Sequence, residues 1–214
     1  MMDELELLKK DWQKKEEHLP KLSYEQIHNM LWKKSSSIVR LIFIISILEF
    51  GLPHLLYLLP YVRENMDVYQ NLGLQNVLIA LSIIQYTVVF YFIYQFYKRY
   101  KEISVLDNSI NLMNKILRTR KTVKHYVIFC LSVLFVSCIV FTFGIYLSDD
   151  IANILVIPEN NDISPEKLKG ILMLGMGIFS VVIVLVMGGV YFLLYGILLR
   201  KLNMNYKELK QLEV

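Results

Sequence analysis

The sequence is poor in the residues that build catalytic and metal centres. It holds only two cysteines, which share one apolar stretch, and four histidines, which are scattered along the chain. The cysteines lie about two helical turns apart on one predicted helix, too far for a disulfide, and we expect them to be small buried apolar residues. No HExxH, CxxC, Walker or GxSxG pattern occurs. We therefore predict no catalytic residue, no metal site and no cofactor. These residues are Cys130 and Cys138, and His18, His28, His54 and His125.

Long apolar runs dominate what is present. Hydrophobic residues make up 55% of the 214 residues. A helix needs about 20 mostly apolar residues to cross a bilayer, and soluble domains have shorter runs. The runs lie at 38–59, 74–97, 126–147 and 168–199, the last being long enough to tilt or project beyond the bilayer. The sequence thus predicts an all-α, integral membrane four-helix bundle over 38–199, without a β-sheet. No cleavable signal precedes Ile38, so we expect the first run to be an uncleaved anchor.

The lysines and arginines are distributed unevenly between the two sides of the predicted spans. Of 23 such residues, all but Arg63, Lys167 and Lys169 fall before or just inside the first run, between the second and third runs, or after the fourth. Positively charged connections stay in the cytoplasm. This predicts a bacterial inner (cytoplasmic) membrane protein with both termini cytoplasmic. Because the basic residues flank spans, we expect them to contact membrane lipids, including anionic headgroups, and expect no nucleic acid partner.

Residues 1–37 read as a cytoplasmic arm of amphipathic helices. Apolar residues recur at helical spacing before Pro20 and again after it. Ser23 is placed to cap the second helix while Gln26 reaches back to the Ser23 backbone, a capping box. An apolar stripe of this kind can receive a partner protein. The candidate partner-binding residues are Leu5, Leu8, Trp12, Ile27, Met30 and Leu31.

The connection at 98–125 and the tail at 200–214 are also predicted to be helical. The connection should prolong the second span, turn and return as a second helix into the third span. Its apolar residues follow a heptad spacing, which predicts a seam that packs on another helix. The stripes either pack on one another and on the lipid surface, or one of them receives a partner. The seam residues are Ile103, Leu106, Ile110, Met113 and Leu117, and those of the tail are Leu202, Tyr206 and Leu209.

A polar cluster interrupts the first and second spans. Glu49 lies near the middle of the first span, where a carboxylate costs about 2.5–3.5 kcal/mol on the insertion scale, so we expect it to face protein and to be able to carry a proton. Pro53 cannot donate to the Glu49 carbonyl, which predicts a bend beside His54. Gln85 in the second span could hydrogen-bond this group. Two interpretations stay open: a structural kink with satisfied polar groups, or a proton-sensitive hinge or substrate site.

Glycines gather in the fourth span. Gly175, Gly189 and Gly196 are separated by multiples of seven, which places them on one helix face where another helix can approach closely. Packing within the chain is the ordinary explanation. A homodimer seam is the alternative.

Several segments carry a resemblance to a known group of proteins. They are DELELLKKDWQ, YEQIHNMLWKKSSSIV leading into IFIISILEF, RTRKTVKHYV, and the ending LLYGILLRKLNMNYKELKQLE. Together they resemble an uncharacterised family of small four-span inner-membrane proteins of Bacteroidetes-type bacteria, some labelled β-carotene monooxygenase-like. That label implies an iron or histidine-rich oxygenase site, with which the scattered histidines disagree. The resemblance also implies a gene context beside an extracytoplasmic-function sigma factor, which would make the arm a partner-binding element.

Two functions follow as hypotheses. The first is a regulatory or interaction protein that presents amphipathic cytoplasmic helices to a partner, and here we lean away from an enzyme. The second is a small transporter or membrane enzyme that works at Glu49, Pro53, His54 and Gln85. The two differ in whether the apolar stripes or the intramembrane cluster carries the activity.

Overall fold

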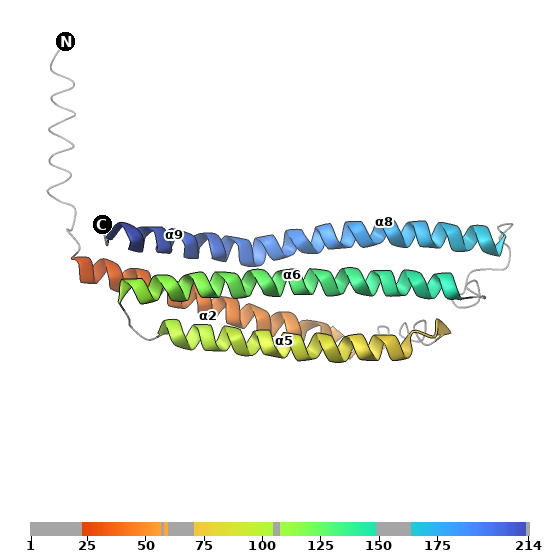
Figure 1. The fold of residues 1–214 in the computed structure, drawn as a ribbon, viewed down its shortest axis with the longest axis horizontal. Helices are drawn as coiled ribbons and strands as arrows, with labels where there is room; N and C mark the ends of the chain where they lie inside the picture. The colour runs from red at the N-terminus through yellow and green to blue at the C-terminus, as the bar shows by residue number, and fades with distance from the viewer. Residues whose placement is uncertain (1–22, 57, 60–70, 105–107, 149–163, 213–214) are drawn as a thin grey trace, which may run out of the picture.

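The computed structural model describes four long helical rods that lie side by side (Figure 1). It describes residues 23–56, 58–59, 71–104, 108–148 and 164–212. The rods are α2 (Tyr24–Leu56), α5 (Gln75–Ser104), α6 (Ser109–Leu147), and a last rod of α8 (Pro165–Tyr191), η1 (Phe192–Gly196) and α9 (Ile197–Leu212). Within these ranges every regular element is a helix, so the predicted all-α bundle is confirmed.

Each rod is long and apolar enough to cross a membrane, which makes this a multi-pass membrane protein by length and composition. The start of α2, the end of α5, the start of α6 and the end of α9 lie together, and we call this the termini end (Figure 1). We call the opposite end, where α6 finishes and α8 starts, the loop end.

Side chains at the helix starts explain where the rods begin. Ser23 and Gln26 form the predicted capping box, with Ser23 N donating to Gln26 Oε1 over 2.9 Å and Gln26 N to Ser23 Oγ over 3.3 Å. Asn108 caps α6 through its side chain, which accepts from Asn111 N over 2.9 Å. Pro165 occupies the first turn of α8, where its missing N–H is harmless.

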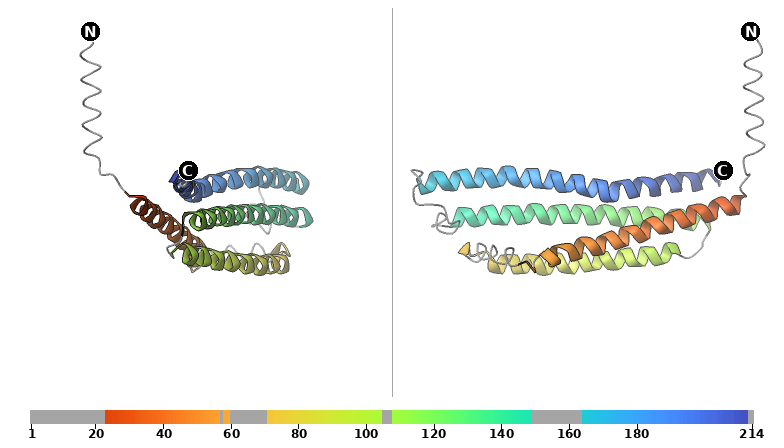
Figure 2. Two further views of the ribbon diagram at one scale, coloured as in Figure 1. Left: turned by 60° about the vertical axis from the view of Figure 1, so that its left-hand side comes forward. Right: turned by 180° about the vertical axis from the view of Figure 1, so that it is seen from behind.

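The four rods do not form a closed four-helix bundle along their whole length. α6 packs on both α5 and α8, and α2 packs along α5. At the termini end α2 also packs on α9, and it then runs obliquely away from the last rod toward α5 (Figure 2). The bundle is therefore closed by α2 and α9 at one end only.

An apolar core closes the termini end. Leu31 of α2, Ile103 of α5, Leu112 of α6 and Leu202 of α9 are all buried in it. Side chains also tie the rods together here: Trp32 Nε1 donates to the Ile103 carbonyl over 2.7 Å. The predicted stripes thus pack on one another, and the tail is helical as expected.

The predicted seam through the connection is wrong in its phase. Ile110 is 55% exposed and Leu117 is 41% exposed, while α6 buries Leu112 and Ile116 instead. α5 ends at Ser104 and α6 begins as a separate helix at Ser109, so one heptad phase does not run through both helices. Ile103 is buried and Met113 is partly buried, whereas Leu106 lies outside the described residues.

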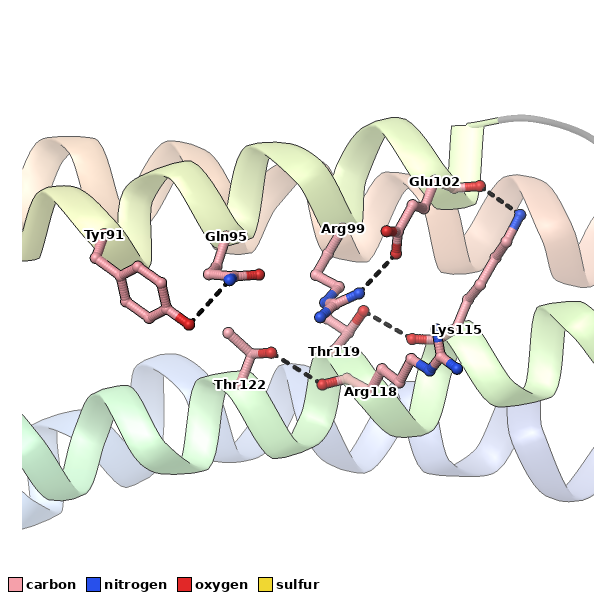
Figure 3. A network of polar contacts seen from close by, with 8 residues as sticks. All are labelled: Tyr91, Gln95, Arg99, Glu102, Lys115, Arg118, Thr119 and Thr122. Atoms are coloured by element: carbon pink, nitrogen blue, oxygen red, sulfur yellow. Dashed lines mark hydrogen bonds and ion pairs between the residues drawn. The ribbon is translucent and has the colours of Figure 1, made fainter.

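Polar side chains line the contact between α5 and α6 near the termini end (Figure 3). Arg99 pairs with Glu102 over 2.8 Å, and Lys115 Nζ of α6 donates to the Glu102 carbonyl over 2.7 Å. Gln95 Nε2 donates to Tyr91 Oη over 3.0 Å one turn earlier. This polar contact and the apolar core together fix α5 against α6.

Aromatic side chains fill the core in the middle of the bundle. Phe92 and Phe96 of α5 meet Tyr126 of α6 edge to face, each with ring centroids 5.4 Å apart. Tyr126 in turn meets Tyr195 of η1, with centroids 6.0 Å apart and planes at 77°. These rings separate the closed termini end from the space between α2 and α8.

Candidate functional site: an intramembrane carboxylate in a four-helix cavity

A cavity of about 460 Å³ lies where α2 diverges from the last rod. Its walls come from α2, α5, α6 and α8, and its lining is mostly apolar and aromatic. The polar groups that line it include Glu49, His54, Gln85, Cys130 and Tyr191. A largely apolar cavity with a few convergent polar groups is the usual form of a small-molecule site.

Glu49 is held at the cavity wall by two tyrosines of the last rod. The Tyr191 hydroxyl donates to Oε1 of the carboxylate, and the Tyr195 hydroxyl donates to Oε2 over 2.9 Å. Both rings are buried, and they stack on each other with centroids 6.0 Å apart. Hydrogen bonds to an ionised acceptor are stronger than neutral ones, so this pair fixes the carboxylate in position.

A π-helical turn places the second tyrosine. The last rod changes from α-helix to a π turn over Phe192–Gly196 and then returns to α-helix. Tyr191 ends the α-helical part, and Tyr195 lies inside the turn. π turns inside α-helices occur frequently at functional sites because they re-aim side chains. Here the turn coincides with the residues that bind Glu49.

His54 forms a second polar group on the same wall. Its Nδ1 lies 2.7 Å from the Phe50 carbonyl and must donate to it, because a carbonyl only accepts. Its Nε2 lies 3.1 Å from the Tyr86 hydroxyl of α5. The rings of Phe50, His54 and Tyr86 pack on one another, with His54 and Tyr86 centroids 5.4 Å apart. His54 is exposed, so it lies at the mouth of the cavity rather than beside the carboxylate.

The cavity brings together all the residues of the predicted polar cluster, but not through the contacts we expected. Glu49, Pro53, His54 and Gln85 all line it. Gln85 is exposed, however, and the carboxylate of Glu49 binds tyrosines of the last rod. The partners Tyr191 and Tyr195 were not predicted. Their spacing of four residues in an apolar run was the available signal, since it places two hydroxyls on one helix face.

The Glu49 carboxylate has no lysine or arginine beside it among the described residues of the cavity. Among the described residues, no three His, Cys, Asp or Glu side chains come close enough to hold a metal ion. Glu49 is half-buried among apolar rods, and an ionised carboxylate that is removed from water is costly unless it is paired. Glu49 is therefore completed either by a proton or by a cation that enters the cavity.

The structure removes part of the predicted partner-binding stripe from the surface. Leu31 is 2% exposed and so is not available to a partner, while Ile27 is half-buried against the same core. The correction has a simple cause: α9 covers this face of α2. Met30 is 46% exposed. Leu5, Leu8 and Trp12 lie outside the described residues.

The glycine face of the last rod does not pack within the chain. Gly175 and Gly189 are exposed, and a side-chain carbon at either position would meet nothing within 4 Å. Gly196 lies inside the π turn, which shifts the helical phase after Gly189 and takes it off the common face. Our expectation of packing within the chain is therefore wrong, because α8 has α6 as its main neighbour and exposes the remaining face.

The fold and the site together define a helical multi-pass membrane protein with a tyrosine-bound carboxylate inside its bundle. The chain belongs to the family described as Domain of unknown function (DUF8845), whose model matches residues 25–214. That match covers the whole cavity and all four rods except Tyr24, the first residue of α2. Neither the curated proteins nor the solved structures contain a match to this chain.

Proposed function

We propose that this protein binds a small lipophilic cation, such as an amine with an apolar body, in the cavity at Glu49. The observation that carries the proposal is the carboxylate itself, which two tyrosine hydroxyls hold in a cavity whose described lining has no lysine or arginine. A cationic ligand would supply the missing countercharge. In this proposal the predicted intramembrane polar cluster forms the binding site. If the protein is a transporter, the same cluster binds the transported cation.

The cavity lining suits the rest of such a ligand. The aromatic residues Phe50, Tyr86, Tyr126 and Phe129 line the cavity, and aromatic rings attract cations through their faces. A cavity of about 460 Å³ has room for a drug-sized molecule. An amphipathic ligand could enter sideways from the bilayer, because the lining residues His54 and Gln85 are exposed at the surface.

The membrane and its orientation are part of the same proposal. Most lysines and arginines among the described residues belong to the termini end, where both α2 begins and α9 ends. The positive-inside rule then assigns this end to the cytoplasm of a bacterial inner membrane. In that orientation, the cavity mouth faces the outer half of the bilayer.

The direct test is binding of tetraphenylphosphonium to the purified full chain in mild detergent. We expect Glu49→Gln to weaken binding of this cation about thirtyfold or more, the cost of removing one partner of a desolvated charge pair. Glu208→Gln is the matched control, since it makes the same change at an exposed position on α9. It should leave the affinity unchanged.

Tetraphenylborate supplies the second control because it has the same shape and the opposite charge. We expect wild-type protein to bind it more weakly than the cation, and Glu49→Gln to reduce that preference. Equal binding of both ions, or full cation affinity in Glu49→Gln, would end the proposal. If the protein transports the cation, flux into vesicles should be lost in the same variant.

A second candidate is an interaction protein that engages a partner at the termini end. Met30 favours it, because this side chain remains exposed beside a core that buries its neighbours. A partner there would contact Met30 and the arm that precedes Ser23. Photo-crosslinking from position 30 in native membranes should capture a partner. A loss of capture on Leu8→Ala with Trp12→Ala would support the arm as the contact, and unchanged capture would contradict it.

A further inference from the structure

A second cavity lies on the other side of the tyrosine pair. It is a groove of about 510 Å³ between α6 and the last rod. Tyr191 lines both this groove and the Glu49 cavity, so the two spaces share one wall. Apart from Tyr191 and Tyr195, the groove is lined by side chains that the proposed cation site does not use.

The groove has a basic end and an apolar end. Arg120, Lys121 and Lys124 of α6 line the part nearer the termini end. Farther along α6 and α8 the lining becomes apolar, with Ile128, Gly188 and Phe192. The change falls where the charged part of α6 gives way to its apolar part. A ligand that fits this groove should have an anionic head and a hydrocarbon body.

The basic residues of the groove are prepared for an anion. Arg120 is fixed at the rim, because its Nη1 donates to Asn203 Oδ1 of α9 over 2.6 Å. That bond uses one of five donors on the guanidinium, and the flat group suits phosphate oxygens. Lys121 and Lys124 are exposed, and none of the described residues that line the groove is acidic. The three positive charges along one rim repel one another, and a bound anion would reduce this repulsion.

Gly188 makes the apolar end deep enough for a chain. A side-chain carbon at this position would come no closer than 4.0 Å to Leu131 Cδ1, so the space beside it is open. An acyl chain could lie against the backbone there and against the ring of Phe192. The combination of bases at a membrane boundary and a groove between membrane helices is one that anionic phospholipids occupy.

We propose that the groove between α6 and the last rod binds an anionic phospholipid, with its phosphate at Arg120, Lys121 and Lys124 and one acyl chain along Gly188 and Phe192. Charge complementarity favours this occupant over a second protein helix, since a helix would leave the three cations without an anion. The site stands independently of the proposed function at Glu49.

Native mass spectrometry of the purified full chain tests this site. The protein is mixed with dioleoylphosphatidylglycerol or dioleoylphosphatidylcholine, which carry the same chains on an anionic and a zwitterionic head. We expect preferential retention of phosphatidylglycerol. Lys121→Gln with Lys124→Gln should reduce its affinity about thirtyfold, whereas Lys33→Gln with Lys34→Gln, an equal charge change on α2, should change it less than about threefold.

Two further variants test the apolar end. Gly188→Leu should fill the groove and abolish retention of the lipid, while Gly188→Ala should fit and retain it. Gly177→Leu, on an open face of the same helix, is the control for folding and should bind as the wild type does.

Three results would overturn the proposal. Equal losses in the two lysine pairs would mean that charge acts without a site. Unchanged binding in Gly188→Leu would place the lipid elsewhere. Displacement of phosphatidylglycerol by excess inorganic phosphate would identify a free anion as the occupant.

Discussion

The helices of this bundle pack differently at its two ends. At the termini end, α2 covers α9, and Leu31, Ile103 and Leu202 are buried between the rods. Beyond the middle of the bundle α2 diverges from α8 and ends, and α8 exposes residues such as Leu185, which is 69% exposed. A smaller core of Leu72, Leu74 and Ile145 still packs α5, α6 and α8 at the loop end. Large exposed apolar surfaces suit contact with lipid or another protein. The comparison shows a closed half, in which all four rods pack together, and an open half, in which α2 stands away from α8.

The polar groups of the candidate site lie where the closed half and the open half meet. Tyr191 and Tyr195 rise from the closed core and reach across to Glu49 on α2. A carboxylate in the open half alone would face lipid at a high cost, and one in the closed half would have no access. The junction offers both a fixed geometry and an opening.

The largest effect should come from a cavity in the closed half. Leu202 is fully buried, so Leu202→Ala should destabilise the protein by about 2–5 kcal/mol. Leu185→Ala makes the same change on the exposed face of α8 and should be nearly neutral. Unfolding in mixed detergent micelles measures both. Similar losses at both positions would break the contrast between the halves.

The next largest effect concerns the junction. Tyr195→Phe removes the hydroxyl that donates to Glu49 and should cost about 1–3 kcal/mol, because a group bound to a charge loses its partner. Tyr94→Phe, at an exposed position on α5, is the control and should have no effect. The same unfolding assay applies. A neutral Tyr195→Phe would mean that the tyrosine only fills space.

The smallest effect tests a single tie in the closed half. Trp32→Phe keeps most of the ring but removes the hydrogen bond to the Ile103 carbonyl. We expect a loss of about 0.5–1.5 kcal/mol, the usual net value of one such bond. Adding Leu202→Ala should give less than the sum of the two losses, since both residues hold α2 in the same core. Strict additivity would separate Trp32 from that core.

The sequence predicts much of the fold because its signals are local. Apolar runs give the rods, and the spacing of Ser23 and Gln26 gives the start of α2. Glu49 stands out because a carboxylate in such a run needs protein around it. These features depend on residues within a few turns of one another.

What the sequence does not reveal depends on helix phase and on packing partners. Tyr195 reaches Glu49 from a π turn, and Gly196 leaves its expected face for the same reason. α5 and α6 are separate helices, so the predicted heptad phase does not continue from one to the other and Leu117 is exposed where a seam was expected. Which rod packs on α2 depends on tertiary contacts between segments that are far apart in the sequence. These contacts bury Leu31.

Distances between spin labels test the central account most directly. In a variant whose native cysteines are replaced by alanine, one pair of labels would be at Leu52 and Leu185 in the open half. The other would be at Asn29 and Lys207 in the closed half, all four sites being exposed. We predict that tetraphenylphosphonium narrows and shifts the distribution of distances between the labels at Leu52 and Leu185, and leaves that of the other pair unchanged. Glu49→Gln should remove this response. A response of the closed pair alone, or an unchanged response in Glu49→Gln, would contradict the account.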